Sequence, residues 1–506
     1  MSHIYQHAER TPDKIAIEMV GSGATRTYRQ LDDASNRGAQ ALRALGIEQG
    51  DHIAVLLENR PELLEIYFAC QRAGVYFTAI SRYLGADEAG YIVSDCGAKI
   101  FIASDQTIEA ARPIAADQSL RCFTVDIAQD DFESWQALCD PLPTTRIRDE
   151  AKGHYMLYSS GTTGRPKGIK RVFDGGPIEG IHPMMQVVCL QMGGMDENST
   201  YLSPAPLYHS APLAVASSAL MYGARVVIME KFAPDAFLSA LEDYEITHTQ
   251  VVPTMFVRLL KLPDATRTRN DVSKLTCAIH VAAPCPIEVK KAMIEWWGPI
   301  LIEYYGGTEG NGVTICDTVD WLAHPGTVGK PLLGRVVIVD ETGSPLPNGQ
   351  TGDVYFDAGL KFSYHNDPEK TAAAHHPEGW STLGDVGYLD ADGFLHLTDR
   401  RAFTIITGGV NVYPQETEDR LIMHPLVRDA AVFGIPDPDL GEAVHAVVEL
   451  LAPADAPADI DSQLAQWCRA ALSGIKCPRS IEFTPALPRT ETGKLMKRVL
   501  RDAYYR

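Results

Sequence analysis

Residues 158–168 hold the densest group of side chains able to do chemistry, with the sequence YSSGTTGRPKG. Three glycines would let backbone amides approach an anion closely, four aliphatic hydroxyls could donate to phosphate oxygens, and Arg165 and Lys167 add positive charge. The pattern therefore predicts a loop that binds phosphate. It lacks the G-x-x-x-x-G-K-[ST] spacing, so the mechanism of the P-loop nucleoside triphosphatases does not follow. The alternative is a flexible surface turn, for which glycine, serine and threonine would suffice.

Four shorter motifs follow in the second half of the chain. They are YGGTE at 305–309, WSTLGD at 380–385, DR at 399–400 and PRTETGK at 488–494. In order and separation, the five motifs resemble those of the adenylate-forming superfamily, which includes acyl-CoA synthetases, firefly luciferases and nonribosomal peptide adenylation domains. The resemblance covers residues 11–501, and several motifs in the correct order are more specific than any one of them.

The resemblance implies a reaction in two steps. A carboxylate is a poor electrophile, so its oxygen first displaces pyrophosphate from the α-phosphorus of ATP, and the resulting acyl adenylate then acylates a thiol. We expect an acyl-CoA synthetase, an AMP-forming carboxylate–CoA ligase of fatty acid metabolism, with ATP, Mg²⁺ and CoA as cofactor and co-substrates. One alternative is an adenylating enzyme that loads a carrier-protein thiol in trans, and another is a luciferase-like oxygenase. A non-catalytic binding protein is disfavoured because the charged motif residues are intact.

The nucleotide-binding residues are also implied by the resemblance. Thr162, Thr163, Gly164 and Lys167 would hold the β- and γ-phosphates, and Glu309 would hold Mg²⁺, which prefers carboxylate oxygen. The Thr308 side chain would contact the α-phosphate, Tyr305 would stack on adenine, and Asp385 would accept hydrogen bonds from the ribose hydroxyls beside Arg400. The complete predicted set is Ser159, Ser160, Gly161, Thr162, Thr163, Gly164, Lys167, Ala282, Ala283, Pro284, Tyr305, Gly306, Thr308, Asp385, Arg400 and Lys494.

Four residues are predicted to be catalytic: Lys494, Thr163, Glu309 and His209. In the family, the lysine of the last motif bridges the attacking carboxylate and the α-phosphate. By composition alone, Lys494 beside the basic pair Lys497 and Arg498 would be a solvated charge. His209 aligns with a family position beside the reacting carboxylate, and its alternative is a hydrogen-bonded core histidine.

The sequence departs from the family pattern in three segments. Residues 281–284 read VAAP where the family has GGAP, which puts the close backbone approach to adenine in doubt. Leu383 replaces a threonine of the W-x-x-T-G-D motif, and we expect the adjacent Thr382 to point to the opposite face of an extended segment. The hinge position is Ala402 in place of aspartate or lysine, and rotation there needs backbone freedom and not a charge.

Two further segments bear on the acyl substrate and its acceptor. Residues 407–416 resemble the loop that lines the pantetheine tunnel of CoA ligases, so Gly408 and Gly409 are predicted to contact CoA; the alternative is a plain β-turn. Residues 183–256 are rich in methionine and other flexible apolar side chains, which favours an apolar acid that is fatty, alicyclic or sterol-like. Core packing would use the same side chains.

Composition narrows the possible partners. The 506 residues suggest three or four structural units, and 45 basic against 65 acidic residues give 45 − 65 = −20, which disfavours nucleic acid and anionic membrane surfaces. An anionic small molecule stays possible because a pocket can be locally positive. The sequence has no transmembrane segment and no apolar signal region near its start, and its ten scattered cysteines indicate reduced thiols, so we expect a cytoplasmic protein. The oligomeric state is open, with a homo-oligomer among the options.

Periodicity indicates the elements that position these motifs. Helical patterns, such as that of residues 61–73, alternate with short apolar runs in residues 27–80 and again in 233–304, which predicts mainly parallel, doubly wound sheets covered by helices. Shorter β-rich runs broken by glycine and proline predict a small antiparallel unit. The predicted organisation is an N-terminal adenylation domain over 1–398, with α/β subdomains at 1–150 and 151–325 and a β-rich subdomain at 326–398, a hinge at 399–402, and a mobile α+β domain at 403–506.

Overall fold

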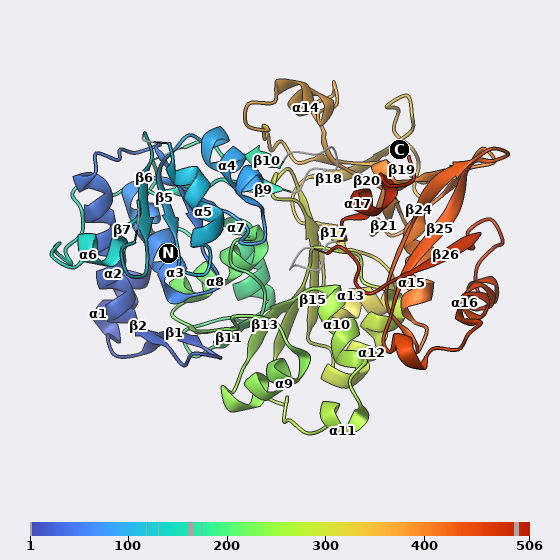
Figure 1. Cartoon of the computed structure of the whole chain (residues 1–506), viewed down its shortest axis with the longest axis horizontal. Helices are drawn as coiled ribbons and strands as arrows, with labels where there is room; N and C mark the ends of the chain where they lie inside the picture. The colour runs from blue at the N-terminus through green and yellow to red at the C-terminus, as the bar shows by residue number, and fades with distance from the viewer. Residues whose placement is uncertain are drawn as a thin grey trace. The chain divides into compact units, whose positions relative to one another are not determined.

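The computed structural model describes residues 3–117, 119–129, 131–159, 166–173, 175–489 and 495–505. The chain divides into two compact units by its internal contacts. The first contains residues 1–281, 291–310 and 361–373, and the second contains residues 282–290, 311–360 and 374–506. Figure 1 traces the chain by residue number. The predicted domain boundary and hinge at 398–402 stay predictions.

A six-stranded parallel sheet forms one layer of the first unit, in the order β7-β6-β5-β3-β4-β8. Its strands are β3 (His52–Leu56), β4 (Tyr76–Ala79), β5 (Ala98–Ala103), β6 (Arg121–Thr124), β7 (Glu133–Ser134) and β8 (His154–Tyr155). The helices of this layer are α2 (Tyr28–Ala44), α3 (Pro61–Ala73), α4 (Ala86–Asp95), α5 (Ile108–Ala115) and α6 (Trp135–Cys139). Proline at the first turn of α3 and Gly74 after its last residue, at φ 67°, explain why this helix has its predicted bounds.

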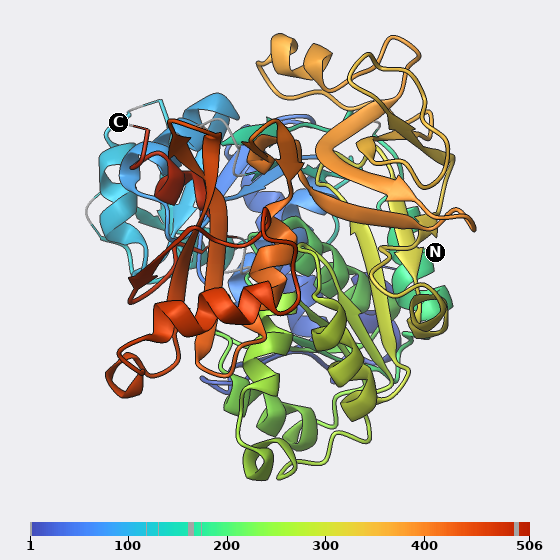
Figure 2. The same ribbon diagram turned by 90° about the vertical axis from the view of Figure 1, so that its right-hand side faces the viewer.

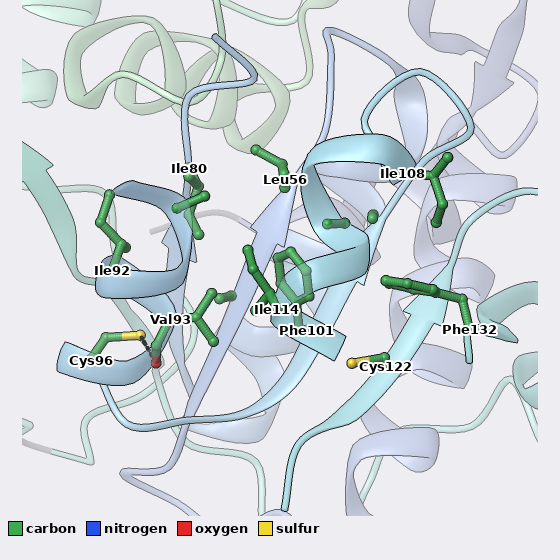
Figure 3. Close-up of a cluster of buried hydrophobic side chains, with 14 of the residues drawn as sticks. Leu56, Ile80, Ile92, Val93, Cys96, Phe101, Ile108, Ile114, Cys122 and Phe132 are labelled. Atoms are coloured by element: carbon green, nitrogen blue, oxygen red, sulfur yellow. Dashed lines mark hydrogen bonds between the residues drawn. The ribbon is translucent and has the colours of Figure 1, made fainter. Parts of the chain in front are cut away.

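Apolar side chains of α4 and α5 pack on one face of this sheet. The cluster includes Phe101 of β5, Ile92 of α4 and Ile114 of α5, which are all buried (Figure 3). Strand positions that face the cluster alternate along β5, as the pleat of a strand requires. This packing fixes the end of α4, where Asp95 lies, against the sheet.

A second sheet of the first unit runs in the order β15-β14-β13-β11-β12-β1-β2, and only the β1–β2 pairing is antiparallel. Its strands are β1 (Ile15–Met19), β2 (Thr25–Thr27), β11 (Thr200–Ser203), β12 (Arg225–Ile228), β13 (His248–Val251), β14 (Cys277–His280) and β15 (Leu301–Gly306). The remaining elements of residues 1–310 are α1 (Ile4–Arg10), β9 (Leu157–Ser159), β10 (Lys167–Ile169), α7 (Pro183–Met185), η1 (Gln186–Met192), α8 (Ser210–Tyr222), α9 (Pro234–Asp243), α10 (Pro253–Leu260), α11 (Asp264–Arg267) and α12 (Ile287–Trp297).

The second unit is rich in antiparallel strands. One sheet runs β18-β19-β20-β21, and another runs β23-β22-β25-β24 with β26 parallel to β25. Figure 2 turns the latter sheet, orange to red, toward the viewer. The bounds are β16 (Val313–Cys316), α13 (Thr318–Ala323), β17 (Lys330–Pro331), β18 (Arg335–Val339), β19 (Gly352–Asp357), β20 (Ser381–Leu389), β21 (Leu395–Arg400), η2 (Arg401–Phe403), β22 (Ile405–Thr407), β23 (Val410–Val412), α15 (Pro414–Ile422), β24 (Val427–Asp437), β25 (Gly441–Leu450), η3 (Pro453–Asp455), α16 (Ile460–Arg469), β26 (Ser480–Thr484) and α17 (Lys497–Arg501).

These layers confirm the predicted α/β class, with two mainly parallel sheets, a β-rich region and an α+β C-terminal region. The periodicity did not predict η1, a π-helix in the methionine-rich segment. Met185 and Met195 at its flanks and Val188 within it are buried, so these apolar side chains belong to the protein interior. Within the described residues, no helix is long and apolar enough to cross a bilayer.

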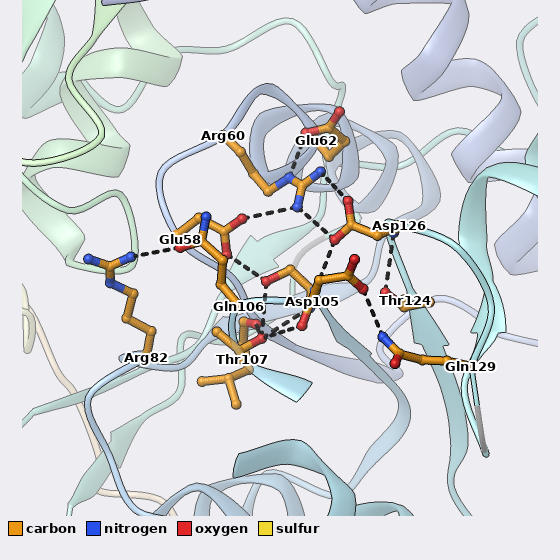
Figure 4. Close-up of polar contacts among 12 residues, drawn as sticks. Glu58, Arg60, Glu62, Arg82, Asp105, Gln106, Thr107, Thr124, Asp126 and Gln129 are labelled. Carbon is orange, nitrogen blue, oxygen red and sulfur yellow. Dashed lines mark hydrogen bonds and ion pairs between the residues drawn. The ribbon is translucent and has the colours of Figure 1, made fainter. Parts of the chain in front are cut away.

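A charged network joins three strand ends of the six-stranded sheet (Figure 4). Arg60, after β3, donates to Glu58 at 3.0 Å and to Glu62 at 2.8 Å, and it pairs with Asp126, after β6, at 3.0 Å. Ser104, after β5, donates to the other oxygen of Glu58 at 2.6 Å. The network lines a pocket of about 360 Å³. Because these groups hydrogen-bond to one another across the strand ends, we assign the network to structural support.

Candidate active site

The parallel sheet of the first unit places several predicted residues along one edge. His209 lies in the connection from β11 to α8, and Tyr305 lies at the end of β15 with Glu309 in the turn that follows. His280, which was not predicted, is the last residue of β14. The carboxyl ends of parallel strands face the same side, which is where ligands bind in open α/β sheets. The fold thus collects side chains from distant parts of the sequence.

The glycine-rich segment is closed by a β-hairpin stem. Its two strands pair antiparallel, with Lys167 of β10 opposite Ser159 of β9 and Gly168 opposite Tyr158. A Cβ atom at Gly168 would lie 2.6 Å from the end of the Met156 side chain and 2.9 Å from the Tyr158 ring, so a larger residue would have to displace these side chains. The predicted phosphate ligands Ser160, Gly161, Thr162, Thr163 and Gly164 lie outside the described residues.

Lys167, predicted to hold the β- and γ-phosphates, and Glu309, predicted to hold Mg²⁺, both contact Tyr364. The tyrosine hydroxyl donates a hydrogen bond of 2.9 Å to Glu309 Oε1. The Lys167 ammonium lies 4.9 Å from the centre of the same ring, within the range of a cation–π contact. A basic and an acidic group predicted to serve one bound polyanion are therefore brought together by a residue that the sequence did not single out.

Asp95, at the end of α4, connects the segment around Tyr364 to the glycine-rich hairpin. The Tyr158 hydroxyl donates to Asp95 Oδ2 at 2.6 Å, and Asn366 Nδ2 lies 3.3 Å from Asp95 Oδ1. His365 Nε2 lies 2.9 Å from the Asp95 carbonyl oxygen. Burial and the Asp95 carboxylate raise the pKa of Tyr158 well above its usual value, so its hydroxyl stays a donor at physiological pH.

The donor set at Glu309 suits Mg²⁺ rather than a transition metal. Among the described residues, no group of three or more histidine, cysteine, aspartate or glutamate side chains is arranged to hold a metal ion. Protein-bound Mg²⁺ commonly uses one or two carboxylates, with water and substrate phosphate completing its octahedral shell. Glu309 has one oxygen engaged by Tyr364, and a carboxylate carries a second oxygen that can bind a cation. The residues present therefore fit the predicted ion.

His209 and His280 are both held at this sheet edge, but in different environments. The His209 ring is half-buried and lies 4.4 Å from the Tyr208 ring, before the first turn of α8. His280 is fully buried, and its Nε2 lies 3.5 Å from an oxygen of Glu303 on the neighbouring strand β15. The His280–Glu303 pair was not predicted, because each residue lies within an apolar strand and the pairing appears only in the sheet register.

Asp385 and Arg400 of the second unit face each other across two antiparallel strands. They are register partners on β20 and β21, and Arg400 Nε lies 3.3 Å from Asp385 Oδ1. Asp385 is buried, whereas Arg400 is partly exposed. The neighbouring Thr382 hydroxyl donates to the Val354 carbonyl at 2.7 Å, so it serves the sheet and does not compensate for the threonine missing at position 383.

Ala282, the first residue of the predicted adenine-binding segment 282–284, has φ 82°. This left-handed conformation favours glycine, which explains why the family pattern has glycine there. The chain keeps the conformation with alanine, so the backbone path is retained at a cost in strain. Ala283 and Pro284 continue this segment at the surface of the second unit.

Gly408 and Gly409 form the turn of a hairpin between β22 and β23, with φ 57° and 78°. Two residues with positive φ are typical of a type I′ hairpin turn. The local geometry is therefore that of a β-turn, the alternative considered for this segment. Gly408 N donates to the Leu440 carbonyl at 2.9 Å, which fixes the turn on the connection between β24 and β25. Their predicted contact with CoA stays a prediction.

Lys494, with residues 490–493, lies outside the described residues, but residues on either side of this segment form ion pairs. Arg489 Nη2 donates to Asp429 at 2.7 Å, and Lys497 Nζ lies 2.8 Å from Glu418 Oε1. Lys497 and Glu418 are both buried. This part of the basic tail is therefore an internal ion pair, and the solvated face suggested by composition does not hold at Lys497.

Comparisons with known proteins agree with the motifs. Residues 4–359 match the family model described as AMP-binding enzyme, and residues 416–494 match the AMP-binding enzyme C-terminal domain. The chain is 32% identical over 506 residues to a feruloyl-CoA synthase of Amycolatopsis sp, covering 99% of this chain and 98% of the relative. It is 31% identical over 516 residues to the fatty acid–[acyl-carrier-protein] ligase ScoC of Streptomyces coeruleorubidus, covering 99% and 95%. An ATP-bound crystal structure of MatB from Rhodopseudomonas palustris superposes with a TM-score of 0.82 at 28% identity, covering 100% of this chain and 99% of that one.

Proposed function

The chain belongs to the AMP-binding enzyme family of the adenylate-forming superfamily, and from this premise we propose that it converts a carboxylic acid with an apolar body into its CoA thioester. It is an AMP-forming acid–CoA ligase: the acid and ATP give an acyl adenylate and pyrophosphate, and the CoA thiol then displaces AMP. The observation that carries the proposal is the contact of both Lys167 and Glu309 with Tyr364, because it gathers a cation and a carboxylate beside the glycine-rich hairpin.

Charge neutralisation and positioning account for most of the first step. The acid and ATP are both anions, so cationic groups are needed where their charges meet. Lys167 would contact the outer phosphates, and Lys494 would bridge the acid carboxylate and the α-phosphate. Mg²⁺, held by Glu309, would neutralise charge on the phosphate oxygens when bound. Asp385 would accept hydrogen bonds from the ribose hydroxyls, with Arg400 orienting its carboxylate.

The second step needs the CoA thiol at the acyl carbon in place of pyrophosphate. The turn at Gly408 and Gly409 is narrow and exposed, which suits a wall along which pantetheine slides. The thiolate attacks the acyl carbon and the AMP phosphate leaves with the bonding electron pair. No cation on the α-phosphate equivalent to that of the first step is required, because AMP is already a good leaving group.

The apolar class of acid is supported by the names of two relatives. One is named for a feruloyl group and the other for a fatty acid, and both acids have an extended apolar body. Met185 and Met195 are buried, so the methionine-rich segment supports an apolar acid less strongly than the names of the relatives do. We include aromatic acids such as ferulate beside the fatty, alicyclic and sterol-like acids.

A second candidate function is the loading of a carrier-protein thiol in trans. It is favoured by one observation, the similarity to a relative named as a fatty acid–[acyl-carrier-protein] ligase. Both acceptors carry the same phosphopantetheine thiol, so the adenylation chemistry is shared.

One experiment separates these functions. The full chain is assayed for AMP and thioester formation with a panel of aromatic, fatty, alicyclic and sterol acids, acetate and amino acids, with free CoA or with a phosphopantetheinylated carrier protein as acceptor. We expect an apolar acid and CoA to give the highest kcat/KM. A strong preference for the carrier would select the second candidate, and acetate or an amino acid as the best substrate would reject the apolar class.

A further inference from the structure

Tyr364 belongs to a short excursion of the chain into the first unit. Residues 361–373 are part of the first unit, although the residues on both sides of them belong to the second. Tyr364 forms an isolated antiparallel bridge with Ile169, and His365 N donates to the Gly168 carbonyl at 2.8 Å. The excursion therefore runs along β10, and its backbone lies beside the strand that begins at Lys167.

The backbone of this excursion is held from a second direction. Asn366 has φ 54°, a left-handed conformation that is uncommon for a residue with a Cβ atom but tolerated by asparagine. Its side chain reaches Asp95 at 3.3 Å, and His365 Nε2 lies 2.9 Å from the Asp95 carbonyl oxygen. Asp95 also accepts the Tyr158 hydroxyl bond at the entry to the glycine-rich segment. One aspartate thus ties the position of Tyr364 to that of the hairpin.

The two contacts of Tyr364 use different parts of the side chain. Its hydroxyl donates to Glu309 Oε1 at 2.9 Å, and its ring face lies 4.9 Å from Lys167 Nζ. A hydrogen bond to one oxygen limits rotation of the Glu309 carboxylate and leaves the second oxygen for a cation. The ring limits where the flexible lysine side chain places its ammonium group.

We propose that Tyr364 is a positioning residue that orients Glu309 toward Mg²⁺ and Lys167 toward the phosphates of ATP. Position 364 lies outside the five sequence motifs. The inference rests on the proposed function, because it requires that the chain binds ATP with Mg²⁺. Since the hydroxyl and the ring act on different groups, separate substitutions can remove one contact or both.

The test measures equilibrium binding of ATP to the full chain by calorimetry, with excess Mg²⁺ and with EDTA. In Tyr364→Phe the ring stays and the hydrogen bond to Glu309 is lost, so Mg·ATP binding should weaken about tenfold while metal-free ATP binding stays within twofold of the native chain. In Tyr364→Leu the ring is lost as well, so metal-free ATP binding should also weaken, by about threefold. Electron paramagnetic resonance, with Mn²⁺ in place of Mg²⁺, measures binding of the metal ion in the presence of ATP directly.

A matched control and a double substitution separate positioning from general damage. Tyr505→Phe removes a tyrosine-to-glutamate hydrogen bond, to Glu442 in the second unit, and should leave both affinities unchanged. In a Glu309→Gln background, Tyr364→Phe should add less than a twofold further loss of Mg·ATP affinity, because its effect passes through the carboxylate. A structural role would produce the same loss in both backgrounds.

The outcomes are distinguishable from failure of the proposed function. If the native chain binds no ATP, with or without Mg²⁺, the proposed function is wrong. If the native chain binds Mg·ATP but Tyr364→Phe binds it within twofold or more tightly, the positioning role is wrong and the function stands. Equal weakening of Mg·ATP and metal-free ATP in Tyr364→Phe, in a folded protein by thermal unfolding, would also overturn the role.

Discussion

Arg400 Nε lies 3.3 Å from Asp385 Oδ1, and the two residues are register partners on adjacent antiparallel strands. The pairing fixes one oxygen of a buried carboxylate by a charged donor. A carboxylate has about four acceptor sites, so Asp385 has the chemistry to accept from the two hydroxyl groups of a ribose 2′,3′-diol. The predicted ribose site therefore has a defined orientation before ligand arrives.

Asp385→Asn should weaken ATP binding. The amide keeps the shape but replaces one accepting oxygen by a donating group, so a ribose hydroxyl would meet a donor and the charge on Arg400 would be unpaired. We expect the KM for ATP to rise about tenfold or more, as is common for loss of a hydrogen bond to a charged group, with little change in the KM for the acid. Steady-state kinetics with both substrates varied checks this, and an equal rise in both KM values would contradict a ribose role.

Lys494 and Gly409 should affect different half-reactions. A cation on the α-phosphate helps pyrophosphate leave, so Lys494→Ala should slow adenylation by roughly 10²–10³, while synthetic acyl-AMP and CoA should still react at near the normal rate. Gly409 has positive φ and open space around its Cβ position, so Gly409→Leu should leave adenylation intact and block thioester formation. We expect the C-terminal domain to rotate about residues 399–402 between the two steps, carrying Lys494 away and bringing Gly408 and Gly409 in. Equal loss of both half-reactions in Lys494→Ala, in a folded protein, would reject this rotation.

The buried Lys497–Glu418 pair should stabilise the C-terminal region. Lys497→Met leaves the Glu418 carboxylate buried without its cation, although the Val432 N–H still donates to it at 2.7 Å, and breaking such a pair costs about 3–5 kcal/mol. The double variant Lys497→Met with Glu418→Gln should recover much of the loss, because the unpaired charge is gone. Urea unfolding of the native chain, the two single variants and the double variant measures this. A loss in the double variant equal to the sum of both single losses would show that the pair is not coupled.

Asp419, beside this pair on α15, should make stability depend on pH. Burial raises its pKa to about 7, whereas an unfolded aspartate has a pKa near 3.9. Between about pH 4 and 7 the folded state therefore holds a proton that the unfolded state has lost, so this group lowers the free energy of unfolding as pH rises, and the decrease is complete above about pH 7. The charged groups that face Asp419 are Glu418, Asp399 and Lys497, and Gln415 donates to it at 2.7 Å.

Asp419→Asn should remove this pH dependence. The amide carbonyl can still accept from Gln415, and the gain in free energy of unfolding should be larger at pH 8 than at pH 5 by on the order of 1–3 kcal/mol. Urea unfolding of both proteins at the two pH values gives the difference. The same gain at both pH values would show that Asp419 is not protonated in the folded protein.

Local patterns were sufficient to predict most elements that carry the site. The predicted helix at 61–73 has the observed bounds because proline begins it and glycine ends it. The pairing of Asp385 with Arg400 also has a local basis. Both residues lie in motifs, and their two strands are joined by a turn that contains Asp392 and Gly393. Fold class and the sheet edge that holds His209, Tyr305 and Glu309 follow from the alternation of strands and helices.

Contacts between distant residues could not be predicted in the same way. Tyr364 and Glu309 are 55 positions apart, and Asn366 and Asp95 are 271 apart, with no periodic pattern or motif linking them. The burial of Lys497 could not be predicted either, because a lysine beside an arginine is typical of a solvated tail. Its partner, the buried Glu418, lies on another helix. These features depend on tertiary packing, which a single sequence does not encode locally.

The most direct test of the account is exchange of labelled pyrophosphate into ATP by the native chain, with an apolar acid and Mg²⁺ and without CoA. A two-step mechanism forms the acyl adenylate reversibly before the thiol is needed, so the account predicts exchange that requires the acid and proceeds without CoA, with AMP as the nucleotide product once CoA is added. Exchange that strictly requires CoA, or formation of ADP in place of AMP, would contradict it.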